Sequence, residues 1–203
     1  KFVDIIESND TIRLASGKKR CRVFWENVEG VLTDKTNAFG CLISSLAGFS
    51  DVLTIKSGRW PNAGLVYGKT RNIAWRVLDA KYFGLPQQRR RLYVIAGGKE
   101  FHPEDVIFEI HSHDSAYGTK WNGNAAAYNG SLFVVQDDRI RRLSPLETER
   151  LMGFPDNYTN LAGAKKTNRY QGTGNSWAVP VVKWIGKRLI NESLDKISLR
   201  ESD

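Results

Sequence analysis

The segment LPQQRRRLYVIAGG (Leu85–Gly98) contains a strand that begins in a cluster of charge. Leu92–Ala96 is a short, continuous apolar run of the length typical of a buried strand, and three arginines lead directly into it. Buried strands accept charged residues only at a high cost in free energy. Alternate residues of an extended chain share a face, so Arg89 and Arg91 point one way and Arg90 the other. The run is either a solvated charge cluster or a site for an anion, because two guanidinium groups on one face can hold a phosphate or a carbonyl oxygen.

A second strand ends abruptly in polar residues. In CRVFWENVEGV (Cys21–Val31), three large apolar residues run directly into Glu26 and Asn27. Ligands of open α/β sheets bind at the carboxyl ends of strands. A carboxyl group in that position is expected to be partly desolvated, which would raise the pKa of Glu26 and let it donate a proton. The alternative is a glutamate that caps a turn or forms a salt bridge.

Hydrophobic periodicity predicts several helices. Residues 2–6 read as the end of one helix, and 35–49 as a second with one apolar face. A third begins at Ser144, where Glu147 completes a capping box, and stops at Gly153. A fourth occupies NSWAVPVVKWIGKRLIN, in which apolar residues recur at helical spacing. Strand–helix alternation in the first half of the chain predicts an α/β fold.

The start of the fourth helix is a candidate ligand site. We expect Asn175 and Ser176 to open this helix, where backbone amides and a capping side chain can bind a polar ligand. Pro180 must then lie near the first turn. The Gly-x-Gly that precedes these residues is a weak signal by itself.

Composition limits the kind of partner and compartment. The chain has 203 residues, 41% of them hydrophobic, and a net charge of +8. Such a charge favours a polyanion, with nucleic acid the first choice and an uninvolved basic surface the alternative. Two cysteines, Cys21 and Cys41, are typical of a reduced, cytoplasmic protein rather than a disulfide scaffold. No apolar run reaches the roughly 18–20 residues that cross a bilayer, so we expect no membrane partner.

Residues 99–138 differ from the rest of the chain in composition and in hydrophobic periodicity. Gly, Asn, His and Ser dominate, and periodicity is lost apart from VIFEI and SLFVV, which indicates a loop-rich insert. Its aromatic residues, including Tyr117 and Trp121, either reach base edges or belong to the loop structure. We therefore expect three segments, with boundaries at 1–98, 99–140 and 141–203.

The order of these motifs is more specific than any one of them. Glu-Asn-Val, then LDAKYFGLPQQRRR, then RRLSPLETERLMGFPD, then GTGNSWAVPVVKWIG closely resembles the C-terminal half of phage and bacterial DNA cytosine-5 methyltransferases. The likeness covers roughly Arg22–Leu189, apart from the insert. It implies the C-terminal part of a Rossmann-like sheet of S-adenosylmethionine-dependent methyltransferases. The insert would be a short target-recognition region, and the enzyme would serve restriction-modification or the protection of phage DNA.

The resemblance assigns catalytic roles to four residues. It implies that Glu26 engages N3 of a cytosine flipped out of double-stranded DNA, and that Asn27 beside it shapes the pocket. Arg89 and Arg91 would contact the cytosine carbonyl and the nearby backbone. The family's chemistry needs these groups because a thiolate adds at C6 of the base, and negative charge then builds toward N3 and O2.

The resemblance also assigns binding roles. Asn175 and Ser176 match the pair that touches S-adenosylmethionine. Arg141 falls in the segment that supports the target-recognition region. The remaining nucleic-acid contacts are expected from Arg90, Tyr117 and Trp121.

Two parts of the family pattern do not occur before Glu26. These are the Gly-rich cofactor loop and the Pro-Cys that supplies the nucleophile, and no proline precedes Cys21 or Cys41. We expect the chain to be inactive without an N-terminal catalytic portion, encoded in the same gene or supplied as a second chain. The alternatives are a non-catalytic DNA-binding remnant or regulatory subunit, and a transfer-RNA cytosine-5 methyltransferase.

Overall fold

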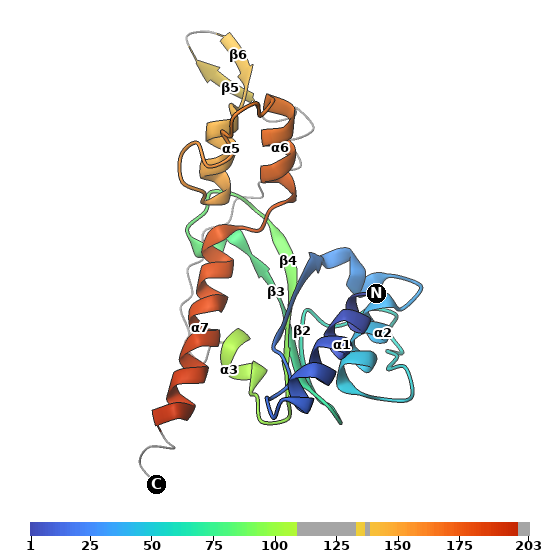
Figure 1. Ribbon diagram of the computed structural model, residues 1–203. Coiled ribbons are helices and arrows are strands. Elements are labelled where there is room, and N and C mark those ends of the chain that lie inside the picture. The colour runs from blue at the N-terminus through green and yellow to red at the C-terminus, as the bar shows by residue number, and fades with distance from the viewer. Residues whose placement is uncertain (109–132, 137–138, 199–203) are drawn as a thin grey trace. The chain divides into compact units, whose positions relative to one another are not determined.

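The computed structural model describes residues 1–108, 133–136 and 139–198, which fall into two units (Figure 1). The sheet unit comprises Lys1–Leu78, Arg90–Ser112 and Arg188–Asp203. The helical unit comprises Asp79–Arg89 and His113–Lys187. The arginine run is therefore divided between them, whereas the sequence placed all of 1–98 in one segment.

Within the described residues, the main sheet has four strands in the order β1-β4-β3-β2. Their bounds are Val23–Val28 for β1, Arg90–Gly97 for β4, Asn72–Asp79 for β3 and Ala63–Tyr67 for β2. β1 pairs antiparallel with β4, and β2 pairs antiparallel with β3. The two predicted strands, β1 and β4, are confirmed and lie side by side. β1 extends through Glu26 and Asn27 rather than ending before them.

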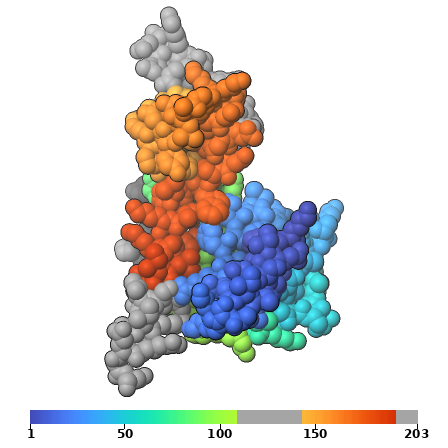
Figure 2. Space-filling view, viewed as in Figure 1, coloured from blue at the N-terminus to red at the C-terminus, as the bar shows by residue number. Residues whose placement is uncertain are grey.

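One face of the sheet carries the core of the sheet unit. This face packs against α1 (Phe2–Ala15), α2 (Ala38–Ala47) and the 3-10 helix η1 (Glu29–Thr33) (Figure 1). The outer side of α1 remains at the surface of this unit, as the dark blue atoms in Figure 2 show. Helices are thus confirmed at 2–6 and within 35–49, but residues 2–6 begin α1 rather than end it, since α1 continues to Ala15. A short helix, α3 (Pro103–Ile107), follows β4. The core residues include Val23, Phe39, Ile43, Leu46, Trp75, Leu92 and Val94.

A buried ionic cluster ties α1 to the residue before β3. Arg71 is fully buried and forms ion pairs with Asp10 and with Glu7, the latter at 2.7 Å. Arg20 donates to Asp10 at 3.0 Å, and so does the backbone N–H of Cys21 at 2.7 Å. Burial alone would raise the pKa of Asp10, but these hydrogen bonds and the charge of Arg71 outweigh it and lower the pKa.

The helical unit contains three longer helices and several short elements. The helices are α5 (Pro145–Met152), α6 (Lys166–Asn175) and α7 (Val179–Ser198), of which α7 belongs to this unit through Lys187. β5 (Phe133–Gln136) pairs antiparallel with β6 (Arg139–Arg142), and the 3-10 helix η2 spans Ala80–Phe83. The capping box of α5 and its end at Gly153 are confirmed. Gly153 has φ +77, and a Cβ there would lie 2.7 Å from Cδ of Pro180, so both conformation and space require glycine.

The prediction that Asn175 and Ser176 open a helix is wrong. Asn175 is the last residue of α6, and Ser176 closes that helix by donating its Oγ hydrogen to the carbonyl of Thr173 at 2.7 Å. The next helix, α7, begins at Val179. Proline lacks an N–H and fits only the first turn of a helix, so Pro180 prevents α7 from beginning several residues earlier.

We expect Ser144→Ala to lower the free energy of unfolding by about 1 kcal/mol. The Ser144 side chain accepts from the N–H of Glu147 at 3.2 Å, and the substitution leaves that donor without its cap. Urea titration followed by far-ultraviolet circular dichroism measures the change. Ser50→Ala, at an exposed position that caps no helix, is the control and should change stability by less than about 0.5 kcal/mol.

Candidate functional site

Glu26 and Arg91 form a charged pair on the face of the sheet opposite the α1–α2 core. In the β1–β4 register, Glu26 lies opposite Tyr93, and Val28 lies opposite Arg91. Residues opposite one another share a face, so the four side chains project from the same side. Arg91 Nε lies 3.2 Å from Glu26 Oε1, and the two side chains are 24% and 14% exposed. The pair is thus largely removed from water.

Aromatic rings lie next to this pair. The ring centroids of Phe24 and Tyr93 are 5.9 Å apart on the same face, and Tyr93 is almost fully buried. Glu26 therefore has the partly desolvated position that the sequence led us to expect. It is also salt-bridged to Arg91, which is the alternative that the sequence left open.

The structure does not bring the Asn27 side chain next to Glu26. Successive residues of a strand point to opposite faces, so Asn27 faces away from Glu26 and Arg91. Its Oδ1 accepts from the N–H of Val28 at 2.8 Å. Glu26 and Asn27 are adjacent in the motif, but their side chains project from opposite faces of the sheet.

Arg90 lies on the face opposite Arg91 and is bound to an acidic residue. Its Nε and Nη2 donate to the two carboxylate oxygens of Glu29 at 2.7 and 3.1 Å. Burial would raise the pKa of Glu29, but hydrogen bonds from Arg90 and Arg59 outweigh it and lower the pKa. A phosphate that binds Arg90 has to compete with this two-point ion pair.

In the helical unit, Arg89 is buried and holds the end of α6. Its Nη2 donates to the carbonyls of Gly174 at 3.2 Å and Ser176 at 2.7 Å. Its own backbone N–H donates to Oδ1 of Asp79 at 2.9 Å. Arg89 thus contacts, through carbonyl oxygens, the segment to which the sequence assigned cofactor binding.

The cofactor-binding residues of the prediction differ in accessibility. The Asn175 side chain is exposed at the end of α6, and Ser176 is half-buried. An exposed carboxamide and a partly accessible serine suit hydrogen bonds to the polar groups of a nucleoside or amino acid. The chemistry of these two residues fits a role at the edge of an S-adenosylmethionine site.

The helical unit has a buried ionic cluster of its own, which the sequence did not predict. Glu149 is fully buried in α5 and forms an ion pair with Arg169 at 2.9 Å. It also accepts from the N–H of Thr159 at 2.9 Å. Burial would raise the pKa of Glu149, but Thr159 and Arg169 outweigh it and lower the pKa. The sequence contains one indication that Glu149 is buried: helical spacing places it on the same face of α5 as Pro145 and Met152.

Three of the predicted nucleic-acid contacts lie in or beside the insert. Tyr117 and Trp121 lie outside the described residues. Arg141 lies in β6 with its backbone opposite Val134, and its side chain is not described.

The thiol of Cys21 does not have the character of a nucleophile. Cys21 is half-buried, and burial together with Asp10 raises the pKa of its thiol, which opposes the reactive thiolate. Cys41 is exposed in α2. No helix in the described part of the chain is long and apolar enough to cross a membrane.

Solved structures identify the fold class. The Entamoeba histolytica methyltransferase EhMeth superposes with a TM-score of 0.55 at 15% sequence identity, over 86% of this chain and 64% of that one. The fold is therefore that of α/β methyltransferases. The C-5 cytosine-specific DNA methylase family matches residues 9–122 and 111–191. The chain belongs to this family.

Curated relatives extend well beyond the length of this chain. A DNA N-6-adenine-methyltransferase of Escherichia phage P1 is 37% identical over 132 residues, which are 54% of this chain and 18% of the relative. The Type II methyltransferase M2.BsuMI of Bacillus subtilis is 30% identical over 154 residues, covering 57% of this chain and 39% of the relative. The chain thus spans less than half the length of either relative.

Proposed function

We propose that this chain is one portion of a DNA cytosine-5 methyltransferase, which transfers a methyl group from S-adenosylmethionine to C5 of cytosine in double-stranded DNA. Restriction-modification or protection of phage DNA is the biological setting, and the cytoplasm the location. The observation that carries the proposal is the largely buried Glu26–Arg91 pair in a member of this family. The pair places a carboxyl group and a guanidinium side by side, as recognition of the N3–O2 edge of cytosine requires.

The chemistry needs both groups. C5 of cytosine becomes nucleophilic only after a thiolate adds to C6, and negative charge then accumulates at N3 and O2. In our proposal Arg91 binds O2 while Glu26 donates a proton to N3, as donors do in an oxyanion hole. When O2 takes the guanidinium, the carboxyl of Glu26 loses its counter-charge in a largely buried position, which favours its protonated form. S-adenosylmethionine would supply the methyl group to C5 and leave as S-adenosylhomocysteine. A base from the other portion of the enzyme or from solvent would then take the C5 proton, and elimination would release the thiolate while the N3 proton returns to Glu26.

Arg89 has a positioning role in this proposal. Its guanidinium is engaged by the carbonyls of Gly174 and Ser176, so it orients the segment in which Asn175 and Ser176 contact S-adenosylmethionine. The family resemblance adds contacts of Arg89 with the cytosine carbonyl and the nearby backbone. DNA contacts are further proposed for Arg90, Arg141, Tyr117 and Trp121. Asn27, whose side chain accepts from the N–H of Val28, is proposed to shape the pocket through the backbone of β1.

The catalytic thiol must come from another portion of the enzyme. The 203 residues contain no Pro-Cys dipeptide, and the raised thiol pKa of Cys21 argues against that residue. We therefore propose an N-terminal portion, in the same polypeptide or in a second chain, as the partner. It would also supply the Gly-rich loop that holds the cofactor.

The test is methyl transfer from radiolabelled S-adenosylmethionine. The 203-residue chain alone is expected to transfer nothing to duplex DNA, and transfer should appear when the N-terminal portion of a cytosine-5 relative is added. Nucleoside analysis should then show 5-methylcytosine. Transfer by the chain alone, or N6-methyladenine as the product, contradicts the proposal. Preference for transfer RNA favours the transfer-RNA enzyme, and DNA binding without transfer favours the non-catalytic remnant.

A further inference from the structure

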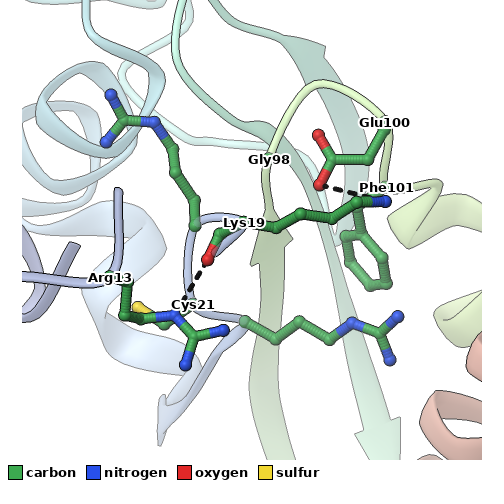
Figure 3. Close-up of a pocket in the computed structure, with 8 residues that line it drawn as sticks. Arg13, Lys19, Cys21, Gly98, Glu100 and Phe101 are labelled. Carbon is green, nitrogen blue, oxygen red and sulfur yellow. Dashed lines mark hydrogen bonds and ion pairs between the residues drawn. The ribbon is translucent and has the colours of Figure 1, made fainter. Parts of the chain in front are cut away.

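A basic cavity lies at the end of the sheet opposite the Glu26–Arg91 pair. It has a volume of about 400 Å³, and its lining includes four cationic residues: Arg13, Lys19, Arg20 and Arg22. Arg13 and Lys19 are labelled in Figure 3. These residues precede β1, and the other wall is formed by Gly98, Glu100 and Phe101, which follow β4. A strand rises about 3.3 Å per residue, so the Cα atoms of Arg22 and Glu26 lie about 13 Å apart.

A second cavity continues the basic surface. It has a volume of about 450 Å³, shares Lys19, Arg20 and Glu100 with the first, and adds Lys18, Lys69 and Lys99. Among the described residues that line the two cavities, Glu100 is the one carboxylate. Its Oε1 lies 3.9 Å from Nζ of Lys19, so it neutralises only part of the charge. The two cavities together form what we call the basic groove.

The arginines build the walls of the basic groove. Arg13 Nε donates to the carbonyl of Lys19 at 2.8 Å, and Arg20 is bound to Asp10 at 3.0 Å. The guanidinium of Arg22 lies 4.8 Å from the centre of the Phe101 ring and donates to the carbonyl of Leu189 at 2.7 Å. These contacts order the backbone of 19–22 before any ligand arrives.

The lysines are arranged differently. Lys18, Lys19, Lys69 and Lys99 are all exposed, and among the residues that the structure describes no ion pair involves the ammonium groups of Lys18, Lys69 or Lys99. Repulsion between these like charges is relieved when an anion binds among them. The ordered arginines and exposed lysines together suit an extended polyanion.

The lining distinguishes a phosphodiester backbone from a free nucleotide. Phe101 is 3% exposed and its ring face is covered by Arg22, so this ring offers no accessible surface for a base to stack on. The Thr70 hydroxyl already donates to the carbonyl of Leu46 at 3.1 Å. Recognition here depends on positive charge along a groove, which is how proteins bind nucleic-acid backbones without reading sequence.

We propose that the basic groove is a second DNA-binding site, which holds the phosphate backbone of duplex DNA at a distance from the methylated cytosine. The choice of duplex DNA rests on the proposed function, whereas the site itself rests on the charges and cavities described above. The groove binds DNA of any sequence and adds affinity without touching the reacting base.

The test is binding of a 20-base-pair duplex that contains only A·T pairs, measured by fluorescence anisotropy at about 100 mM salt. The double variant Lys18→Glu/Lys69→Glu is expected to bind at least about tenfold more weakly. The slope of log affinity against log salt should also become shallower by about two, because each phosphate contact contributes about 0.9. Glu100→Gln is expected to strengthen binding about two- to fivefold, an effect opposite in sign that misfolding cannot produce.

The control is Lys183→Glu/Lys187→Glu, which changes the net charge equally on exposed positions of α7. An equal loss of affinity in the control would show a bulk charge effect and overturn the proposal. Lysine acetylation read by mass spectrometry locates the site directly: DNA should protect Lys18, Lys19, Lys69 and Lys99.

Other outcomes are equally decisive. The proposal is overturned if DNA does not protect the groove lysines from acetylation. It is also overturned if the groove binds single-stranded RNA or vesicles of anionic lipid more tightly than duplex DNA. Because the probe contains no cytosine and no methyl transfer is measured, a failure of the proposed function would leave this result unchanged. Conversely, if the completed enzyme methylates DNA and the groove variants bind DNA as tightly as the wild type, the groove proposal is refuted and the proposed function stands.

Discussion

Glu26→Ala is expected to slow methyl transfer at least about 100-fold in the enzyme completed with an N-terminal portion. The alanine cannot donate a proton to N3 of cytosine, so the charge that builds there in the transition state is left without stabilisation. Single-turnover transfer at saturating DNA and S-adenosylmethionine measures this step. Because the loss occurs in the transition state, DNA affinity should change by less than about threefold.

Glu29→Ala is the matched control for Glu26. Glu29 is also a partly buried glutamate in an ion pair with an arginine of β4, but its partner Arg90 lies on the other face of the sheet. Its removal should change the transfer rate by less than about threefold. Equal rates for the Glu26 variant and the wild type, or equal losses for both variants, would contradict the catalytic role of Glu26.

Asp10→Ala is expected to lower the free energy of unfolding by about 3–5 kcal/mol. Arg71 is fully buried, and the substitution removes its buried counter-ion, leaving only Glu7, whose side chain is 47% exposed. The same change deprives the backbone N–H of Cys21 of its acceptor. Urea unfolding monitored by tryptophan fluorescence measures the loss, since Trp60 and Trp75 lie in the same unit.

Glu7→Ala separates burial from charge. Glu7 pairs with the same arginine at 2.7 Å but faces solvent, so its loss should cost no more than about 1 kcal/mol. A Glu7 variant as unstable as the Asp10 variant would show that exposure does not set the energy of this cluster.

The pH dependence of stability provides a second measure of Asp10. The hydrogen bonds from Cys21 and Arg20 and the charge of Arg71 hold the pKa of this carboxyl, in the folded protein, below the 3.8 that is ordinary for aspartate. The ionised carboxylate therefore adds stability above this range, and the contribution is lost as the pH falls from about 4 through the lower folded-state pKa. The Asp10→Ala variant lacks this component, so its stability should fall less steeply with acid than that of the wild type.

Local signals allowed the elements with clear patterns to be predicted. The apolar runs of β1 and β4 and the capping box at Ser144 depend on neighbouring residues, and all three are confirmed. β2 and β3 received no prediction, although both lie in the same sheet. The helix α6 was missed because its sequence, KTNRYQGTGN, contains two glycines and few strong helix formers.

Contacts between distant residues were beyond sequence reasoning. Alternation correctly separated Arg90 from Arg91, but it could not show that Arg91 would meet Glu26, since that depends on the antiparallel register. Nor could it show that Arg89 would bind carbonyls more than eighty residues away. The tertiary contacts of α6 also compensate for its weak propensity: Arg169 pairs with Glu149.

The pairing of β1 with β4 restricts how this region can change length during evolution. Deletion of one residue from β1 before Glu26 would turn the carboxyl toward the apolar core, because side chains alternate between faces. Deletion of two residues would restore the face but displace Glu26 from Arg91 by about 7 Å. Substitutions can therefore accumulate here, whereas insertions and deletions are expected to concentrate in connections without strand pairing, such as residues 48–62.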